Sequence, residues 1–170
     1  MPLFTRRPRL PAEIRTRLTV PPGDRLLCVT ELTDGRWAGA SRAALYTATA
    51  DGTSQRRPWA DVDHAQLAAE TATLTIYWVD GHDDILTLTG PGAPAFARTL
   101  RERVQSSVVH SEIVMLPGGA QVRVALRRDE DGGLLSQVIG VGAVDLADPD
   151  VAALVDAAEA RVRSAAGLRA

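Results

Sequence analysis

Three neighbouring side chains, His82, Asp83 and Asp84, have the chemical types that bind metal ions. One imidazole and two carboxylates on a single turn would supply part of a cation site. Protein metal sites of the structural and catalytic kinds need three or four ligands that converge on the ion. The other histidines are far away in the sequence, so we interpret this segment as a solvated turn and expect no metal site.

A second group of carboxylates, Asp145, Asp148 and Asp150, has the alternating spacing of a calcium-binding loop. The glycine at the sixth position of such a loop and the glutamate at its twelfth position are missing. Asp148 stands directly before Pro149, the order expected for a helix N-cap followed by the first helical residue. We therefore expect these aspartates to start a helix.

The sequence patterns of catalysis are incomplete. Gly140 and Gly142 follow an apolar segment but lack the third glycine of a dinucleotide-binding loop. Ser106 and Ser107 lie near His110, yet a catalytic triad is defined by geometry and not by proximity in sequence. The sequence therefore predicts a protein that is not an enzyme, with no cofactor and no identified small-molecule substrate.

Cys28 is the only cysteine, which excludes a disulfide within the chain. It lies among apolar residues of an expected strand, where a thiol behaves as a small buried hydrophobe. Trp37, Trp59 and Trp78 are candidate anchors for a partner. Because the chain has only three Trp, two Tyr and two Phe, we expect these rings in the core instead.

All 19 residues of the Lys and Arg class are arginines, and the chain also lacks asparagine. Both missing residues have AT-rich codons, so we expect a bacterial genome rich in G and C. Charged residues interrupt the N-terminal twenty positions, where a signal peptide would need an apolar stretch. We therefore expect a cytoplasmic protein.

The charge is uneven along the chain. Residues 1–60 carry a net charge of +5 and residues 61–170 a net charge of −7. Pairing between the two parts is the interpretation that we favour. The alternative is that the basic segment binds an anionic membrane surface or nucleic acid. The candidate residues for this binding are Arg6, Arg7, Arg9, Arg15 and Arg17.

Short alternating segments predict seven strands between residues 25 and 88, after a short helix over 12–18 with Ile14 and Leu18 on one side. An amphipathic helix follows, Pro94 to Val109, in which Phe96 begins an apolar series at every fourth residue. The expected strands are 25–32, 36–40, 44–49, 54–59, 62–69, 72–79 and 83–88. Helix competes with strand over 62–69, since Ala, Gln and Leu are good helix formers.

The last of these hairpins has two possible registers. Asp80 and Gly81 have the sequence of a two-residue turn, but that turn would separate the apolar side chains of the two strands. A loop of odd length over 80–82 instead sets Leu74, Ile76, Leu86 and Leu88 on one face, beside Trp78. Because a slip of one residue moves every side chain to the other face, we expect the odd loop.

Residues 111–170 predict a three-stranded antiparallel sheet, over 111–116, 121–128 and 134–139, followed by a helix that begins at Pro149. We expect the helix to bury Val151, Leu154, Val155, Ala158 and Val162. So small a core is marginal alone. The predicted division is therefore a basic N-terminal segment, 1–23, a main domain, 24–110, and a C-terminal subdomain, 111–170, that packs on the main domain.

Three local sequences within residues 25–109 resemble bacterial pleckstrin-homology-like (PH-like) domains: GASRAALY at 39–46, PWADV at 58–62 and PAFARTLRERVQ at 94–105. The resemblance implies an α+β fold, a seven-stranded bent sheet or partial barrel capped by one helix. It also implies a recognition module for lipids, peptides or proteins. Phosphoinositide-binding members cluster basic residues in the first hairpin loop, where this chain offers only Asp34 and Arg36.

We expect a non-catalytic module for recognition of another protein, or for self-association as a homodimer. The expected surface is an open edge of the sheet or a groove between that edge and the helix. Binding of an anionic membrane or nucleic acid through the N-terminal arginines is the alternative.

Overall fold

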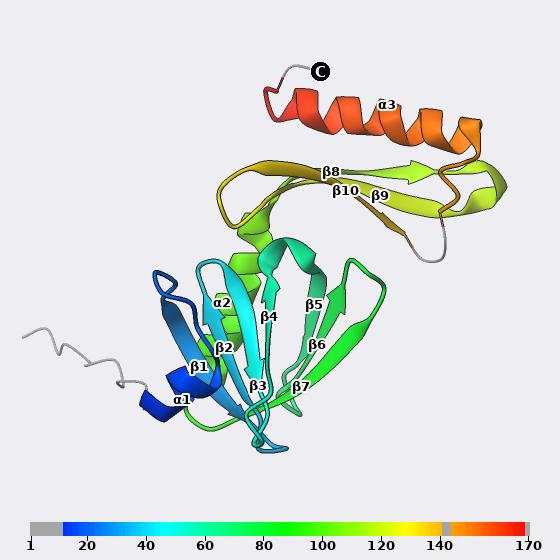
Figure 1. The fold of residues 1–170 in the computed structure, drawn as a ribbon. Helices are drawn as coiled ribbons and strands as arrows, with labels where there is room; N and C mark the ends of the chain where they lie inside the picture. The colour runs from blue at the N-terminus through cyan, green and yellow to red at the C-terminus, as the bar shows by residue number, and fades with distance from the viewer. Residues whose placement is uncertain (1–11, 141–143, 169–170) are drawn as a thin grey trace, which may run out of the picture.

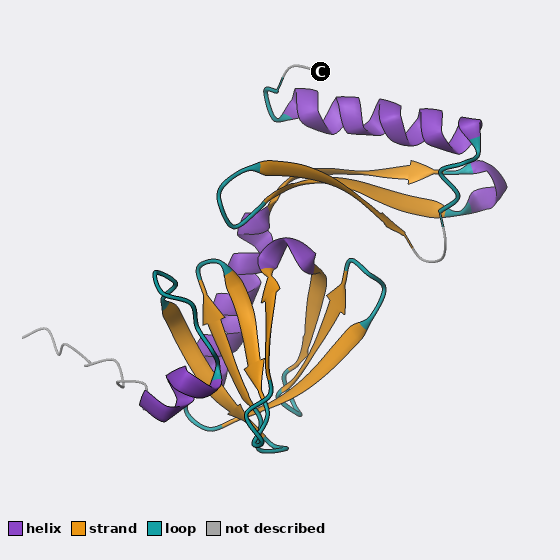
Figure 2. Ribbon diagram, in the orientation of Figure 1, coloured by secondary structure: helices purple, strands orange, loops and turns teal. Residues whose placement is uncertain are grey.

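The computed structural model describes residues 12–140 and 144–168, which form two antiparallel sheets and their helices (Figure 1, Figure 2). The larger sheet has the strand order β4-β3-β2-β1-β7-β6-β5, and the smaller one β10-β9-β8. The predicted α+β class is confirmed, with a seven-stranded open sheet and one helix followed by three strands and a final helix. The first part contains α1 (Ala12–Arg17), β1 (Leu26–Leu32), β2 (Trp37–Ser41), β3 (Ala44–Ala48), β4 (Ser54–Pro58), the short 3₁₀ helix η1 (Trp59–Asp61), β5 (Val62–Ala68), β6 (Thr73–Trp78), β7 (Asp83–Thr89) and α2 (Ala93–Ser107). The second contains β8 (Val108–Met115), η2 (Pro117–Gly119), β9 (Gln121–Arg128), β10 (Leu134–Gly140) and α3 (Pro149–Ala165).

The seven-stranded sheet is bent because its two halves meet over a short junction. β1 pairs with β2 along most of its length, but with β7 only at Glu31–Thr89 and Leu32–Leu88. The two halves splay apart from this corner (Figure 1). The strands β4 and β5 are left as the two edges of an open sheet.

Helix α2 packs across the open sheet and completes its core (Figure 2). Phe96 and Leu100, one helical turn apart, are buried in one apolar cluster with Leu32 of β1. The chain enters the helix beside β1 because Gly92 has no side chain. A Cβ atom at this position would collide with the backbone oxygen of Val29.

The β6–β7 hairpin has the predicted apolar face but a different loop. The loop is formed by residues 79–81 and not by 80–82, since the Trp78 N–H donates to the His82 oxygen at 2.9 Å. Gly81 takes a φ of +87°, which favours glycine and fixes the turn. Both loops are odd, so both give the same face. Buried on this face are Leu74, Ile76, Trp78, Leu86 and Leu88.

The segment for which strand and helix competed is the strand β5. It pairs with β6 from Val62 to Ala68, and this pairing outweighs the helical propensity of its residues. A β-bulge lies between Val62 and His64. The bulge twists the start of the strand, and the residues around it contact the second sheet.

Helix α2 ends before the predicted Val109, and β8 starts directly at Val108 instead of at residue 111. The apolar spacing of the helix continues to Val108, which is why periodicity extended the helix too far. The Ser107 hydroxyl donates to the Val104 oxygen at 2.7 Å, within the last turn. Val108 and Val109 are branched at Cβ and favour extended backbone. The helix therefore runs into the second sheet without a loop.

Helix α3 covers one face of the second sheet (Figure 1). The Asp148 side chain accepts from the Asp150 N–H at 2.9 Å, which confirms the predicted N-cap. The prediction that Leu154 is buried was wrong: its side chain is 39% exposed. The helix packs against a single sheet, so its buried stripe is narrow. The stripe consists of Val151, Val155, Ala158 and Val162.

The central strand β9 uses both of its faces. Its apolar residues Val122, Val124 and Leu126 join the core beneath α3. The opposite face contacts the end of the seven-stranded sheet, where Arg123 binds the Asp63 carboxylate at 2.5 Å. On β10, the Gln137 amide donates to the Ala60 oxygen at 3.1 Å.

Arg127 of β9 is the most buried part of this joint, with no exposed surface. Its Nη1 donates to the Val62 oxygen at 2.6 Å and to the Ser107 hydroxyl at 3.3 Å, and its Nη2 donates to the Asp63 oxygen at 3.1 Å. Burial lowers the pKa of the guanidinium, and the charge of Asp63 offsets part of this effect. The predicted division into segments 1–23, 24–110 and 111–170 stays a prediction. The contacts of Arg123, Arg127 and Gln137 link the two sheets.

Replacing Arg127 by alanine leaves the Val62 and Asp63 oxygens without their buried donor. We expect Arg127→Ala to lower the free energy of unfolding by about 3 to 5 kcal/mol. The control is Arg128→Ala, because Arg128 is exposed and makes one hydrogen bond to the Gly132 oxygen at 3.3 Å. Arg128→Ala should lower the free energy of unfolding by less than about 0.5 kcal/mol. Urea denaturation measures both, and equal losses would contradict the role given to Arg127.

Candidate functional site

The edge strand β5 has backbone groups that face away from the sheet. The Trp78 N–H donates to His82 and the Leu88 N–H to the Ala72 oxygen, so the even residues of β6 bond to β7. In an antiparallel ladder the odd residues of β6 then bond to β5. Their partners in β5 are the even residues. The N–H and C=O groups of Ala65 and Leu67 therefore point outward along the free edge.

A groove runs between this edge and α2. Its volume is about 550 Å³. Leu67 is 50% exposed within it, and Leu74 is buried at its base. Arg98 and Arg101 of α2 are exposed on the other wall. The lining consists of Ala65, Leu67, Leu74, Pro94, Ala97, Arg98, Leu100 and Arg101.

We call this surface the β5–α2 groove. It combines a free strand edge, an apolar floor and two cations that make no hydrogen bond or ion pair with another residue of the described ranges. A free edge donates and accepts main-chain hydrogen bonds with a further strand, and adjacent pockets take alternate side chains of that strand. The arrangement is chemically suited to an extended polypeptide that carries apolar and acidic side chains.

The residues of the suggested cation turn have other partners. Asp84 accepts from the Trp78 indole N–H at 2.9 Å, and the His82 ring contacts the Asp80 carboxylate at 3.2 Å. Arg57 binds the same Asp80 at 2.6 Å and lowers the pKa of its carboxyl to about 2. Among residues 12–140 and 144–168, no three His, Cys, Asp or Glu side chains gather as metal ligands would.

Two of the three tryptophans are core residues. Trp59 and Trp78 are buried, and the Trp59 indole donates to the Ser41 oxygen at 3.1 Å. Trp37 is half-buried and packs against the apolar cluster around α1. The core interpretation is confirmed for Trp59 and Trp78.

Cys28 lies partly buried against the core of the large sheet, as its apolar neighbours predicted. Burial raises the pKa of its thiol, and a hydrogen bond with Thr99 opposes this shift. The thiol therefore has little thiolate character at neutral pH.

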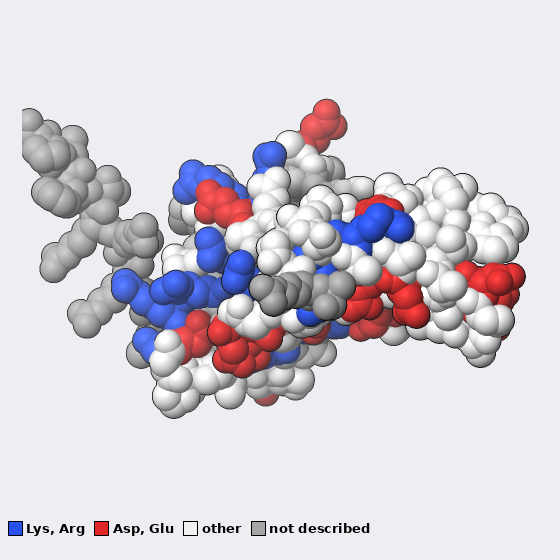
Figure 3. Space-filling view, turned by 90° about the horizontal axis from the view of Figure 1, so that it is seen from above, with Lys and Arg blue, Asp and Glu red and all other residues white. Residues whose placement is uncertain are grey.

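The candidate anion-binding arginines are only partly described. Arg6, Arg7 and Arg9 lie outside the described residues, whereas Arg15 and Arg17 are exposed on α1. Figure 3 shows the charge distribution from the side of α3, with basic atoms gathered toward the end of the molecule that carries α1 and acidic atoms between and beyond them. The two described arginines remain accessible to a partner.

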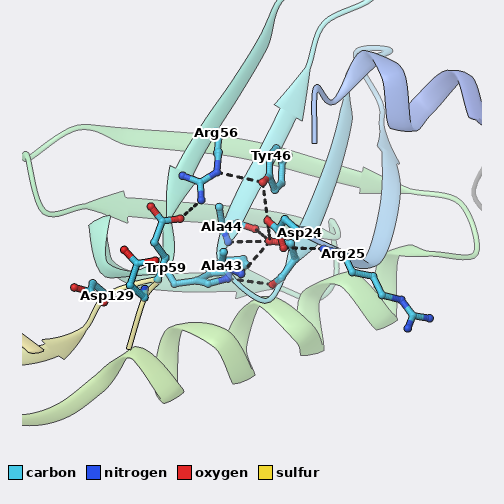
Figure 4. Close-up of polar contacts among 11 residues, drawn as sticks. Asp24, Arg25, Ala43, Ala44, Tyr46, Arg56, Trp59 and Asp129 are labelled. Atoms are coloured by element: carbon cyan, nitrogen blue, oxygen red, sulfur yellow. Dashed lines mark hydrogen bonds and ion pairs between the residues drawn. The ribbon is translucent and has the colours of Figure 1, made fainter. Parts of the chain in front are cut away.

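One polar network had no signal in the sequence, because its members come from separate elements (Figure 4). The Asp24 carboxylate accepts from the Ser41 hydroxyl and from the Tyr46 hydroxyl, both at 2.7 Å. Arg56 donates to the Tyr46 hydroxyl at 3.2 Å and forms an ion pair with Glu130 of the β9–β10 turn. Burial, and then Asp24, raise the pKa of Tyr46. The network ties the first sheet to the second.

Comparison of the chain with protein-family models, with curated proteins and with solved structures found no match. None of the helices in residues 12–140 and 144–168 combines the length and the apolarity of a membrane span. What the β5–α2 groove binds is therefore inferred from its residues alone.

The raised pKa of Cys28 predicts slow alkylation. At pH 8 we expect iodoacetamide to modify the folded chain at least about tenfold more slowly than the chain unfolded in urea, because both burial and protonation protect the thiol. The rate should still rise with pH above the ordinary range of a cysteine. Mass spectrometry follows the reaction. Equal rates in the folded and unfolded chains would contradict the buried position.

Proposed function

We propose that the chain is a non-catalytic recognition module that binds an extended segment of another protein in the β5–α2 groove. The observation that carries this proposal is the free edge of β5 beside an apolar floor. A strand that adds to this edge would pair with Ala65 and Leu67 and place alternate side chains over Leu74.

The charges of the groove indicate the chemistry of its occupant. Arg98 and Arg101 favour an acidic segment. The Arg-rich residues 1–17 of the same chain have the like charge and are poorly suited to this place. A second copy of the chain would have to bring an acidic extended segment of its own. We therefore assign the groove to a different protein with alternating apolar residues and at least one acidic residue.

The proposal of a binding role also rests on what the polar side chains do. Asp84, Asp148 and Ser41 are engaged in hydrogen bonds that hold a tryptophan, a helix start and a strand turn. Such bonds stabilise local structure, and they occupy side chains that could otherwise act as an acid, a base or a nucleophile. The resemblance to PH-like domains stays part of the proposal. The order of seven strands followed by α2 supports it.

A second candidate is binding of an anionic membrane surface or nucleic acid by Arg6, Arg7, Arg9, Arg15 and Arg17. The exposure of Arg15 and Arg17 on α1 favours it. Ile14 of α1 and Leu18, directly after it, hold this helix against the sheet, since both are buried in a cluster with Tyr46. The two arginines would therefore be presented from a fixed surface.

The groove proposal predicts which peptides bind. Random peptides displayed on phage and selected on the full chain should be enriched in alternating apolar and acidic residues. By fluorescence anisotropy, Leu67→Asp and the double variant Arg98→Glu, Arg101→Glu should each weaken a selected peptide at least about tenfold. Methylation of the backbone nitrogens of the peptide should abolish strand addition.

The matched control is Ile85→Asp, because Ile85 is 57% exposed on β7 and does not line the groove. It should leave the affinity unchanged. Selected peptides that bind the Leu67→Asp variant normally would contradict the proposal. A dimer in light scattering that this variant dissociates would show that a second copy occupies the groove instead.

The second candidate predicts binding that depends strongly on salt. Duplex DNA or vesicles of phosphatidylcholine and phosphatidylglycerol should bind the wild-type chain. Replacing all five arginines by glutamine should make the slope of log K against the logarithm of the salt concentration shallower by several units. Co-sedimentation and filter binding measure the two cases. Binding that is unchanged by these substitutions would exclude the N-terminal arginines as the site.

A further inference from the structure

A second hollow lies where the two sheets meet, and it shares no lining residue with the β5–α2 groove. Its outer part has a volume of about 770 Å³, within the range of small-molecule sites. A narrow inner recess of about 70 Å³ adjoins it. The two spaces share Arg42, Ala43, Arg103 and Glu130.

Arginines dominate the charged lining. Arg42 comes from the β2–β3 turn, Arg103 from α2 and Arg25 from the segment before β1. None of these guanidiniums forms a hydrogen bond or ion pair with another residue of the described ranges. The Nε of Arg103 is moreover shielded from solvent without an acceptor. A buried guanidinium donor without an acceptor is costly, and a bound anion would satisfy it.

The linings of the two spaces together hold five arginines and four acids, and most of the acids have partners of their own. Asp24 accepts from Ser41, Tyr46 and the Arg25 N–H (Figure 4). Glu130 pairs with Arg56.

Two further acids belong to the β9–β10 turn. Asp129 accepts the backbone N–H groups of Asp131 and Gly133. Asp131 is exposed at the outer rim. The inner recess is lined by three arginines, Arg42, Arg103 and Arg128, and by two acids, Asp129 and Glu130, so it keeps an excess of positive charge.

We infer that this recess binds the phosphate group of a small phosphorylated molecule, held between Arg42 and Arg103. A space of about 70 Å³ corresponds to roughly two water molecules at about 30 Å³ each, so it takes one compact anionic group and no larger part of a ligand. Planar guanidiniums donate two parallel hydrogen bonds to such an anion. The outer hollow would receive the rest of the molecule against Pro21, Pro22 and Leu26.

This inference is independent of the proposed peptide site. The phosphate site is built from the β2–β3 turn, from the C-terminal half of α2 and from the β9–β10 turn. The groove uses β5, β6 and the N-terminal half of α2. Loss of either activity would leave the other intact, so the two proposals fail separately.

Titration calorimetry of the full chain with inorganic phosphate tests the site, with sodium chloride of equal ionic strength as the reference. Phosphate should bind the wild-type chain and raise its Tm, whereas chloride should not. Arg42→Gln and Arg103→Gln should each weaken phosphate at least about tenfold. Arg161→Gln, which removes an exposed arginine of α3 that lines neither the hollow nor the groove, is the matched control and should bind phosphate normally.

Because Arg42 is exposed, its substitution should leave the Tm without phosphate unchanged, so lost binding is not lost folding. Vesicles of phosphatidylcholine with phosphatidate distinguish the source of the phosphate. Sedimentation with them that requires Arg42 and Arg103 assigns the site to a lipid phosphate, and phosphate binding without sedimentation assigns it to a soluble molecule. No phosphate binding, or binding that survives both substitutions, would overturn the inference.

Discussion

The guanidinium of Arg127 is fully buried where the two sheets meet, and the elements around it supply acceptors for both of its Nη atoms, whereas its Nε has none among the described residues. Its guanidinium takes the oxygens of Val62 and Asp63 and the hydroxyl of Ser107 as acceptors. A buried charge without such partners would cost several kcal/mol. The start of β5, the end of α2 and the middle of β9 must therefore meet at one point, and each of the three can shift only if the others shift with it.

The bulge in β5 and the end of α2 have a common explanation in this meeting point. The bulge lies between Val62 and His64, where the strand turns its oxygens toward Arg127. Ser107 stops α2 one residue before the first residue of β8, and its hydroxyl accepts from the same guanidinium. Both irregularities would weaken their own element in isolation. In the folded chain, their hydrogen bonds with Arg127 stabilise them. They also fix the position of α2 between the groove and the hollow.

Apolar alternation predicted most of the strands, since most have one face against a core. It left strand and helix undecided for β5 and started β8 three residues late. It also selected the correct face of the β6–β7 hairpin from the positions of Leu74 and Leu86 alone. It could not locate the loop to the residue, because every odd loop serves that face equally well. Nor could it indicate that Arg127 is buried. Arg123 and Arg127 alternate with the apolar residues of β9, as exposed residues of a strand do, and Arg127 is buried only because the first sheet packs on that face. The hollow was out of reach for the same reason, since Arg42 and Arg103 are sixty-one positions apart in the sequence.

Helix α2 contributes Arg98 and Arg101 to the groove and Arg103 to the hollow, and it continues into β8 without an intervening loop. Because one helix lines both spaces, it cannot shift at the groove without also shifting at the hollow. A displacement of the helix at the groove would therefore also move Arg103 in the hollow. The fifteen residues of α2 are thus a structural element common to both surfaces, and its continuation into β8 anchors both to the second sheet.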